Sequence, residues 1–216
     1  MGGRHTGGVL CRVAMVEDDP LLRASVSDAL THRDDIDVVS VSDSGADAVA
    51  LAKAKSVDVA LLDVHLGSGP SGFDIARALR QASPGVGIVF LSSVKDPRLL
   101  GYNPATLPAG ARYLLKSEVS DVSVLAEVIL AAADDAYDGD KALPSLPFTQ
   151  TQIDILRLVA AGYSNQAIAK ERVVTERAVE VAVSRLAKHL GLRETPGVNQ
   201  RVHIATTFFR EMGWSP

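Results

Sequence analysis

The sequence predicts an α/β domain with a doubly wound, five-stranded parallel sheet, followed by a small all-α domain. Two observations support this prediction. Through the first 137 residues, short runs rich in Val, Ile and Leu alternate with longer helical patterns, and beyond them no strand signal remains. Strands and helices in strict alternation indicate a parallel sheet that is covered on both faces.

Five apolar runs are the expected strands: 11–16, 36–41, 57–62, 86–91 and 111–115. Around them, apolar residues recur at helical spacing in three sets: Leu22, Val26, Ala29 and Leu30; Ile75, Ala76 and Leu79; Leu125, Val128, Ile129 and Ala132. One interval, 96–110, holds three prolines and two glycines. We therefore expect the fourth helix to be short, displaced or largely loop.

Acidic residues and then prolines fill residues 134–147, which predicts a linker within this stretch. The predicted organisation is a first domain over 1–137, a linker over 138–147 and a second domain over 148–216. Helical patterns in the second domain run over 149–161, 164–171, 175–190 and 198–212.

Charge separates the two halves of the chain. Residues 1–140 contain 12 Lys and Arg against 20 Asp and Glu, a net charge of −8, while residues 141–216 contain 10 against 6, a net charge of +4. A basic second half is typical of a domain that binds a polyanion such as nucleic acid. Cys11 is the single cysteine, which excludes an internal disulfide, and no apolar run is long enough for a membrane span. We expect a cytoplasmic protein without a membrane partner.

Polar side chains follow the predicted strands at the edge where an open parallel sheet forms its binding sites. They are Glu17, Asp18 and Asp19 after the first strand, Asp63 after the third, Ser92 and Ser93 after the fourth, and Lys116 after the fifth. Asp19 precedes Pro20 and an apolar helix, which is the pattern of an N-cap followed by a proline. Glu17, Asp18 and Asp63 would repel one another without a cation between them. Carboxylate oxygens are donors that suit Mg²⁺.

This arrangement resembles the receiver domain of two-component response regulators, which has a flavodoxin-like fold, over almost the whole first half. The matching residues are Glu17 and Asp18 as the acidic pair, Asp63 as the phosphoacceptor, Ser92 as the Ser/Thr residue, Tyr113 as the aromatic switch and Lys116 as the lysine. The resemblance implies that Asp63 attacks the phosphorus of a phosphohistidine on a sensor histidine kinase and forms an acyl phosphate.

The resemblance also implies roles for the surrounding groups. Mg²⁺ would be held by Asp18, Asp63 and the backbone carbonyl of His65, with Glu17 acting through water. Lys116 and Ser92 would contact phosphoryl oxygens, and Tyr113 would follow Ser92 inward. A tyrosine that packs at a strand end without switching is the alternative for Tyr113.

The loop after Asp63 departs from the family pattern. The family usually has proline four residues after the phosphoacceptor and glycine eight after it, whereas this chain has Gly67 and Ser71, with Gly72 one position later. We expect a longer and more flexible loop. Ser93 stands where the family has a smaller residue, and the interval 96–110 replaces a helix that many regulators use for output.

The second domain resembles the helix-turn-helix of the NarL/FixJ regulators, which is of LuxR type, over residues 151–191. The matching stretches are 156–162, 164–169, 174–179 and 190–192. Gly162 is expected to end one helix, and Ser164 and Thr175 are expected to cap the next two. In the third helix an apolar stripe is expected to be buried; it consists of Val179, Val183, Leu186 and Leu190.

The opposite side of the third helix carries cations, a hydroxyl and a methyl-bearing side chain. These residues are Arg177, Val181, Ser184 and Lys188, with Arg185 beside them. Such a face can enter the major groove of double-stranded DNA and contact phosphates, base edges and a thymine methyl. Glu180 stands where the family commonly has lysine, which predicts weak binding or an unusual sequence preference.

The last predicted helix has a seam of apolar residues at alternating spacings of four and three: Val198, Val202, Ala205, Phe209 and Met212. This seam packs either on its own domain or on a second copy. The resemblance implies that it forms a homodimer in the active state, with DNA half-sites about 34 Å apart.

We interpret the chain as a transcription regulator controlled by phosphorylation, and not as an enzyme beyond its own phosphotransfer and dephosphorylation. One alternative keeps the fold but controls DNA binding without phosphorylation, through a constitutive dimer or a small ligand. A phosphatase with an aspartyl nucleophile is a second alternative. It leaves the helix-turn-helix unexplained, and it lacks a second acid two residues beyond Asp63, where His65 stands.

Overall fold

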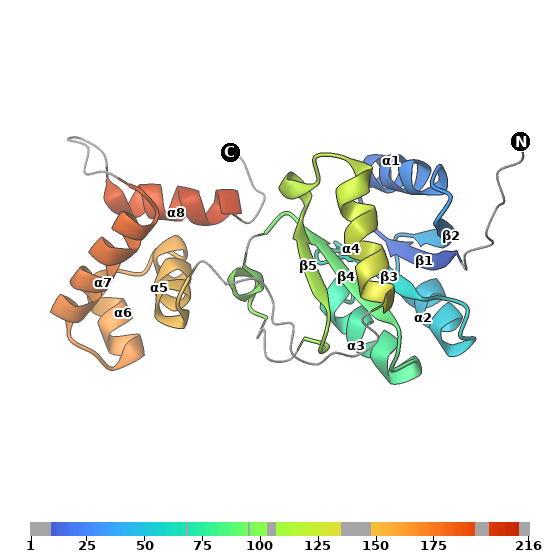
Figure 1. Ribbon diagram of the computed structural model, residues 1–216. Helices are drawn as coiled ribbons and strands as arrows, with labels where there is room; N and C mark the ends of the chain where they lie inside the picture. The colour runs from blue at the N-terminus through green and yellow to red at the C-terminus, as the bar shows by residue number, and fades with distance from the viewer. Residues whose placement is uncertain are drawn as a thin grey trace, which may run out of the picture. The chain divides into compact units, whose positions relative to one another are not determined.

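The computed structural model describes residues 10–67, 69–94, 96–102, 107–134, 148–192 and 199–211 (Figure 1). Contacts divide the chain into two compact units. Unit 1 comprises residues 1–92 and 105–144, and unit 2 comprises residues 93–104 and 145–216. Within the described part of the chain, no helix has the length and apolar character needed to cross a membrane.

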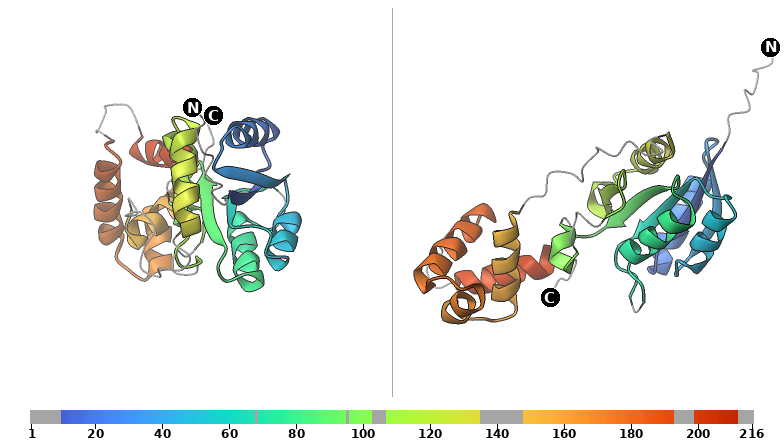
Figure 2. Two further views of the ribbon diagram at one scale, coloured as in Figure 1. Left: turned by 45° about the vertical axis from the view of Figure 1, so that its right-hand side comes forward. Right: turned by 90° about the horizontal axis from the view of Figure 1, so that it is seen from below.

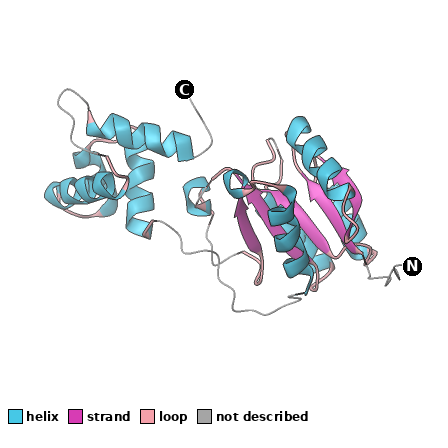
Figure 3. Cartoon of the chain, turned by 45° about the horizontal axis from the view of Figure 1, so that its top comes forward, coloured by secondary structure: helices cyan, strands magenta, loops and turns pink. Residues whose placement is uncertain are grey.

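Unit 1 is built on a parallel sheet (Figure 3). Its strands are β1 (Cys11–Val16), β2 (Ile36–Ser42), β3 (Val59–Asp63), β4 (Gly87–Ser92) and β5 (Arg112–Leu115), in the order β2-β1-β3-β4-β5. All four pairings are parallel. The strand order reverses between β1 and β3, and a doubly wound sheet binds its ligands outside the carboxyl ends of the strands at such a reversal.

Helices cover both faces of this sheet (Figure 1). Helices α1 (Pro20–Thr31) and α4 (Val122–Asp134) lie on one face, and α2 (Ala46–Lys53) and α3 (Gly72–Ala82) on the other. Alternate strand residues point to opposite faces. Val13 and Met15 of β1 therefore share a core with Leu30 of α1 and Ile129 of α4.

The predicted fold class is confirmed, and so are all five strands, whose bounds shift by at most two residues. The predicted N-cap is also confirmed, because Asp19 Oδ1 accepts hydrogen bonds from the backbone nitrogens of Leu21 and Leu22 at 2.8 and 3.1 Å. The interval 96–110 holds no α-helix among its described residues. It contains the 3-10 helix η1 (Pro97–Leu100), as its prolines and glycines predict, and a second 3-10 turn, η3 (Lys116–Glu118), follows β5.

Unit 2 contains the helices α5 (Gln150–Ala160), α6 (Asn165–Arg172), α7 (Glu176–His189) and α8 (Gln200–Glu211). The predicted caps are confirmed: Ser164 Oγ accepts from the backbone nitrogen of Ala167 at 3.1 Å, and Thr175 Oγ1 accepts from that of Ala178 at 3.2 Å. Gly162 follows α5 in the left-handed region, with φ of +85°. Glycine tolerates this conformation, so the chain can turn sharply into α6.

The position of residues 93–104 differs from the sequence-based domain ranges, which place them in the first domain. The described residues among them, 93, 94 and 96–102, group with unit 2. The physical reason is burial: Val94 and Leu99 are 4% and 2% exposed, and they belong to the same apolar core as Ile153 and Leu156 of α5. The predicted linker, 138–147, lies outside the described residues.

Candidate functional site

Three carboxylates gather at the carboxyl ends of β1 and β3. Glu17, Asp18 and Asp63 each offer an oxygen, and these oxygens lie within 4.8 Å of one another. Glu17 and Asp63 are buried, whereas Asp18 is exposed. The acids lie where the strand order reverses, so the fold brings them to the place where a ligand site is expected.

Lys116 reaches the same cluster from the end of β5. Its Nζ donates a hydrogen bond to Asp63 Oδ2 at 2.8 Å and to Glu17 Oε1 at 3.0 Å. Burial lowers the pKa of Lys116, but the hydrogen bonds and charges of Asp63 and Glu17 outweigh burial and raise it. One ammonium group balances one of the three negative charges, so the cluster retains an excess negative charge that a divalent cation can neutralise.

Glu17 lies in surroundings that oppose its ionisation. Burial, which outweighs its hydrogen bond to Lys116, raises the pKa of Glu17 from 4.5 to about 7, with a further contribution from Asp63. Both carboxylate oxygens of Glu17 lie 3.0 Å from Lys116 Nζ, so they share the one ammonium group with Asp63. Three carboxylates with one ammonium group to balance them, and with ligand oxygens within 4.8 Å of one another, fit the donor set of a Mg²⁺ site.

The backbone around Asp63 is closely packed. The backbone nitrogen of His65 donates to Asp63 Oδ1 at 3.1 Å, while the His65 residue is exposed. A Cβ at Gly72 would lie 2.1 Å from the Asp63 carbonyl oxygen. Only a glycine permits this close approach of the backbone at residue 72 to Asp63. Gly72 lies one position later than the glycine of the family pattern, because the loop before it is one residue longer.

Ser92 and Tyr113 lie on the neighbouring strands. Ser92 ends β4, is 2% exposed and is in register with Leu115, next to Lys116. Tyr113 is half-buried on β5, and its ring centroid lies 6.4 Å from that of Phe90. The strand ends thus bring Ser92 to the same edge as Asp63, while the packing of Tyr113 fits either of its two predicted roles.

Arg23 was not predicted at this site. From α1 its Nη1 donates to the backbone oxygens of Glu17 and Asp18 at 2.7 and 3.3 Å. The contact holds the acidic loop against the first turns of α1. The sequence contains no signal for it, because Arg23 is a polar residue on an amphipathic helix like many others.

In unit 2, the predicted DNA-contacting face of α7 is exposed. Its residues are Arg177, Val181, Ser184, Arg185 and Lys188. Val179, Val183 and Leu186 on the opposite side are buried, as predicted, and Leu190 is half-buried. Arg177 Nη1 lies 2.8 Å from Glu180 Oε2, so an acid neutralises one of the cations on this face.

The predicted seam of α8 is partly described. Val202 is 58% exposed and Phe209 is 37% exposed, while Ala205 is half-buried. Val198 and Met212 lie outside the described residues. A different stripe, with Ile204 and Thr207, is buried in unit 2. The described seam residues therefore leave apolar surface available for a second copy.

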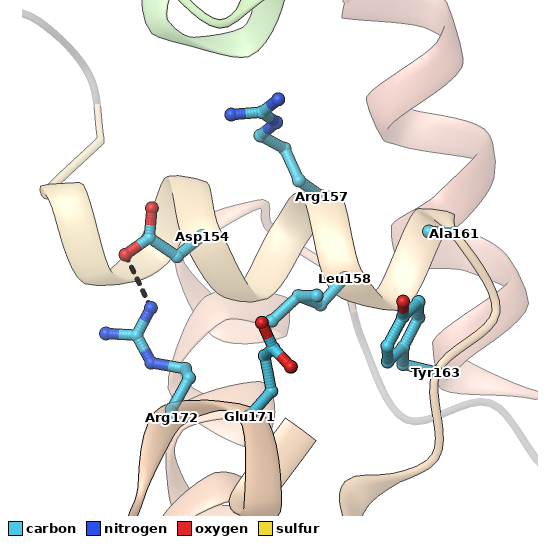
Figure 4. A pocket seen from close by; sticks show the side chains of 7 residues that line it. All are labelled: Asp154, Arg157, Leu158, Ala161, Tyr163, Glu171 and Arg172. Atoms are coloured by element: carbon cyan, nitrogen blue, oxygen red, sulfur yellow. Dashed lines mark hydrogen bonds and ion pairs between the residues drawn. The ribbon is translucent and has the colours of Figure 1, made fainter. Parts of the chain in front are cut away.

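Unit 2 also has a pocket of about 640 Å³ (Figure 4). Its lining residues come from α5, α6 and the loop between them: Asp154, Arg157, Leu158, Ala161, Tyr163, Glu171 and Arg172. An ion pair between Asp154 of α5 and Arg172 of α6 joins the two helices at 2.5 Å, and the Arg157 side chain points away from this pair. None of the five α7 residues above lines this pocket, so it is separate from the predicted DNA-contacting face.

A buried aspartate with two neighbouring acids and a lysine, joined in one chain to a helix-turn-helix unit, defines a class of signal-dependent DNA-binding proteins. Comparison with protein families supports both parts. The model of the response regulator receiver domain matches residues 13–129, and that of the bacterial regulatory proteins of the luxR family matches residues 146–202.

Individual relatives agree over nearly the whole chain. The nitrate/nitrite response regulator protein NarP of Escherichia coli is 31% identical, over 94% of this chain and 96% of that protein. The probable transcriptional regulatory protein NarL of Mycobacterium tuberculosis is 30% identical, over 85% of this chain and 89% of that protein.

Solved structures show the same fold. Two RcsB dimers bound to two parallel DNAs match with a TM-score of 0.59 at 16% identity, over 94% of this chain and 99% of that chain. The signal receiver domain of NarL from Mycobacterium tuberculosis matches with a TM-score of 0.50 at 31% identity, over 59% of this chain and 98% of that domain.

The chain belongs to the NarL/FixJ family of two-component response regulators. It is a phosphorylation-dependent, DNA-binding transcription regulator.

Proposed function

We propose that Asp63 accepts a phosphoryl group from a phosphohistidine of a sensor histidine kinase, and that the modified chain binds double-stranded DNA as a homodimer through α7. One observation carries the proposal: Asp63 is a buried carboxylate at the switch point of the sheet, within 4.8 Å of two other acids and 2.8 Å from Lys116. The same groups would promote hydrolysis of the acyl phosphate and no other turnover.

The transfer exchanges one bond for another. A carboxylate oxygen of Asp63 attacks the phosphorus as the bond from phosphorus to the donor imidazole nitrogen breaks, and the electron pair of that bond remains on the imidazole. Negative charge that collects on the phosphoryl oxygens is stabilised by the Lys116 ammonium, which exchanges its contact with Asp63 Oδ2 for one with a phosphoryl oxygen. The peptide nitrogen of His65 holds Oδ1 in place at 3.1 Å.

Glu17, Asp18, Asp63 and the backbone carbonyl of His65 are the groups that would hold Mg²⁺, with Glu17 acting through water. When bound, this ion neutralises negative charge on the transferring group. The close approach of three carboxylates, with oxygens within 4.8 Å of one another and one lysine to balance them, supports this assignment. Asp18 is exposed, so its carboxylate is accessible to an ion that arrives from solvent.

After phosphorylation, Ser92 contacts a phosphoryl oxygen, and Tyr113 moves with it. Ser92 is buried at the end of β4, so its hydroxyl approaches a modified Asp63 along the strand edge. In unit 2, Arg177, Arg185, Ser184 and Lys188 contact phosphates and base edges, and Val181 contacts a thymine methyl. The exposed seam of Val202, Ala205 and Phe209 pairs two copies.

Incubation with Mg²⁺ and a small phosphodonor, followed by mapping of the modified residue by mass spectrometry, tests the acceptor. Asp63→Asn is expected to abolish labelling, whereas Asp19→Asn, at a helix cap beside the cluster, is expected to retain it. Labelling that survives in Asp63→Asn would sink the proposal. Equal DNA affinity of the wild-type protein with and without phosphodonor would instead favour control without phosphorylation.

A further inference from the structure

A short segment from the middle of the receiver sequence belongs structurally to the DNA-binding unit. It consists of residues 94 and 96–101, and we call it the β4–η1 segment. In the sequence it lies between β4 and β5, which are paired neighbours in the sheet of unit 1. In space it groups with unit 2, where η1 packs beside α5 (Figure 2, right).

Apolar side chains anchor this segment. Val94 and Leu99 are 4% and 2% exposed, and both belong to the core that contains Phe148, Ile153 and Leu156. Leu100 packs at the margin of the same core. The segment is therefore part of the hydrophobic core of unit 2 and not a loop on its surface.

A buried ion pair fixes the segment in one geometry. Asp96 has no exposed surface, accepts a hydrogen bond from the backbone nitrogen of Arg98 at 3.0 Å, and pairs with the Arg98 guanidinium at 2.6 and 2.9 Å. The same guanidinium donates to the backbone oxygen of Phe148, directly before the Thr149 cap of α5. Bidentate pairs of this kind are directional, so they define orientation as well as proximity.

The connection from the phosphorylation site to this segment is very short. Ser92 ends β4 at the edge that carries Asp63, and Val94 is already buried in the core of unit 2. Two residues span at most about 7 Å when fully extended. A displacement of Ser92 must therefore be absorbed by Ser93 or passed to the core that supports α5.

We propose that the β4–η1 segment is a built-in coupling element, which transmits the state of the Asp63 site through the covalent chain to the core of the DNA-binding unit. The proposal rests on the proposed phosphorylation of Asp63. In this arrangement the phosphorylation signal reaches unit 2 without a helix between β4 and β5 on the face of the sheet. The described part of 96–110 contains no α-helix that could serve as such a face. Ser92 is displaced, the segment follows, and α5 and the helices packed on it follow the segment.

A flexible insertion in the full-length protein tests whether the β4–η1 segment transmits the signal, without disturbing the folding of either unit. A Gly-Ser-Gly-Ser insertion between Ser93 and Val94 leaves the buried anchors intact but removes the mechanical link. The same insertion between Pro84 and Gly85, an exposed turn before the same strand, is the matched control. The probe is a genomic DNA fragment selected by the wild-type protein, and its affinity is measured before and after treatment with phosphodonor.

The expected result is loss of the phosphorylation-dependent gain in DNA affinity in the first insertion variant, with normal labelling of Asp63 by intact mass and normal affinity before labelling. The control insertion is expected to retain the gain. A full gain in both variants overturns the coupling. Absence of labelling at Asp63 in the wild-type protein overturns the proposed function instead, so the two failures are distinguishable.

Hydrogen exchange of the full-length protein tests the packing independently. Leu99→Ala is expected to increase amide exchange in α5, although residue 99 lies within the receiver part of the sequence. Leu79→Ala, at an equally buried leucine of α3, is expected to increase exchange in unit 1 instead. Unchanged protection of α5 in Leu99→Ala would show that the segment does not support that helix, and would overturn the inference.

Discussion

Glu17 is held in surroundings that oppose its ionisation. The residue is 1% exposed, and the carboxylate of Asp63 belongs to the same cluster. Burial first, and then the charge of Asp63, raise the pKa of Glu17 to about 7 despite the hydrogen bond from Lys116. Without a divalent cation, Glu17 therefore binds a proton near neutral pH, where an ordinary glutamate does not.

This raised pKa predicts how stability depends on pH in the presence of a chelator. The folded chain keeps the Glu17 proton up to a pH of about 7, whereas the unfolded chain loses it near 4.5. As pH rises through this window, ionisation favours the unfolded state. We expect the contribution of Glu17 to lower the free energy of unfolding by about 3 kcal/mol between these pH values, as measured by urea unfolding.

Glu17→Gln removes the titrating group and is expected to remove this fall. Asp18→Asn, which changes an exposed acid of the same cluster, is expected to leave the fall in place. The explanation is wrong if the Glu17→Gln protein loses as much stability as the wild type over the same pH range.

Gly72 controls the approach of α3 to the phosphoacceptor. A Cβ at this position would lie 2.1 Å from the Asp63 carbonyl oxygen and 3.1 Å from Val64 Cα. We expect Gly72→Ala to lower the free energy of unfolding by roughly 1–3 kcal/mol, the usual cost of overpacking, and to slow labelling by a small phosphodonor. Thermal unfolding and the labelling rate measure the two effects.

Gly85→Ala is the matched control, because a Cβ at Gly85 meets no atom within 4 Å. This variant is expected to be neutral or slightly stabilised, since alanine restricts the unfolded chain. Similar losses of stability and labelling in both variants would contradict a role for the close contact at Gly72.

Residue identity and position were enough to predict the Asp19 cap and the convergence of Glu17, Asp18 and Asp63. The carboxyl ends of parallel strands meet at one edge of the sheet, so the positions of these acids directly after their predicted strands were enough to place them together. Arg23 and Asp96 could not be predicted in this way. Their partners are near in sequence, but the burial of Asp96 and the direction of the Arg23 side chain depend on tertiary packing. A charged residue in a helix or a proline-rich loop is ordinarily solvated.

At the scale of elements, α7 has a buried apolar face and an exposed basic face. The acid Glu180 offsets part of the positive charge on the exposed face. The ion pair of 2.8 Å between Arg177 and Glu180 ties up the first cation of the helix. Both side chains are exposed, so the pair itself adds little stability. Its main consequence is for binding, because the acid offsets the attraction of Arg177 for DNA phosphates.

Glu180→Gln is expected to strengthen DNA binding by freeing Arg177 for a phosphate. One additional phosphate contact increases the slope of log affinity against log salt concentration by about 0.9. Titration of the wild-type and variant proteins at several salt concentrations measures the slope. Glu118→Gln, at an exposed acid of η3, is the control for net charge, and an equal increase in that variant would argue against the local explanation.

Helix α8 has two apolar stripes with different environments. Ile204 is buried, while Val202 is 58% exposed. If the exposed stripe serves a second copy, Val202→Ser changes the stability of the monomer by less than about 0.5 kcal/mol, as is usual at surface positions. The same change is expected to weaken the phosphorylated dimer in sedimentation experiments and binding to paired half-sites.

Ile204→Ser provides the comparison and is expected to cost several kcal/mol, because it places a hydroxyl in an apolar core. The alternative is that the seam packs within its own domain. That reading would be favoured if urea unfolding showed Val202→Ser to be as destabilising as Ile204→Ser.

The elements themselves were largely predictable, and their burial patterns explain why. Continuous apolar runs gave the central strands, and the breakers in 96–110 indicated that no regular helix would form there. The docking of η1 was not predictable. Its apolar residues resemble any short hydrophobic loop, and the core that covers them is formed by helices about fifty positions later in the sequence.

At the scale of the whole molecule, the two cores are not supplied by two continuous stretches of chain. Unit 2 needs Val94 and Leu99 in addition to the residues after 145. A fragment of residues 145–216 is therefore expected to be less stable than the same helices in the intact protein. Burial of these two side chains accounts for about 3–5 kcal/mol.

Urea unfolding of the fragment, followed by the helical signal, measures this loss. An otherwise identical fragment that begins at residue 93, with residues 105–144 replaced by a flexible linker, is the control and is expected to recover most of the stability. Equal stability of the two fragments would mean that Val94 and Leu99 contribute nothing to the core.

The chain passes between the units at three points, after residues 92, 104 and 144. A gene fusion that joins a foreign receiver domain to these helices at a single point near residue 144 would omit Val94 and Leu99. The core of the helical unit would then lack two of its buried side chains. A working hybrid has to carry residues 93–104 along with the helices, as an insert within the borrowed receiver. Exchange of input modules is thereby restricted, and the two halves of this regulator are expected to share a common line of descent.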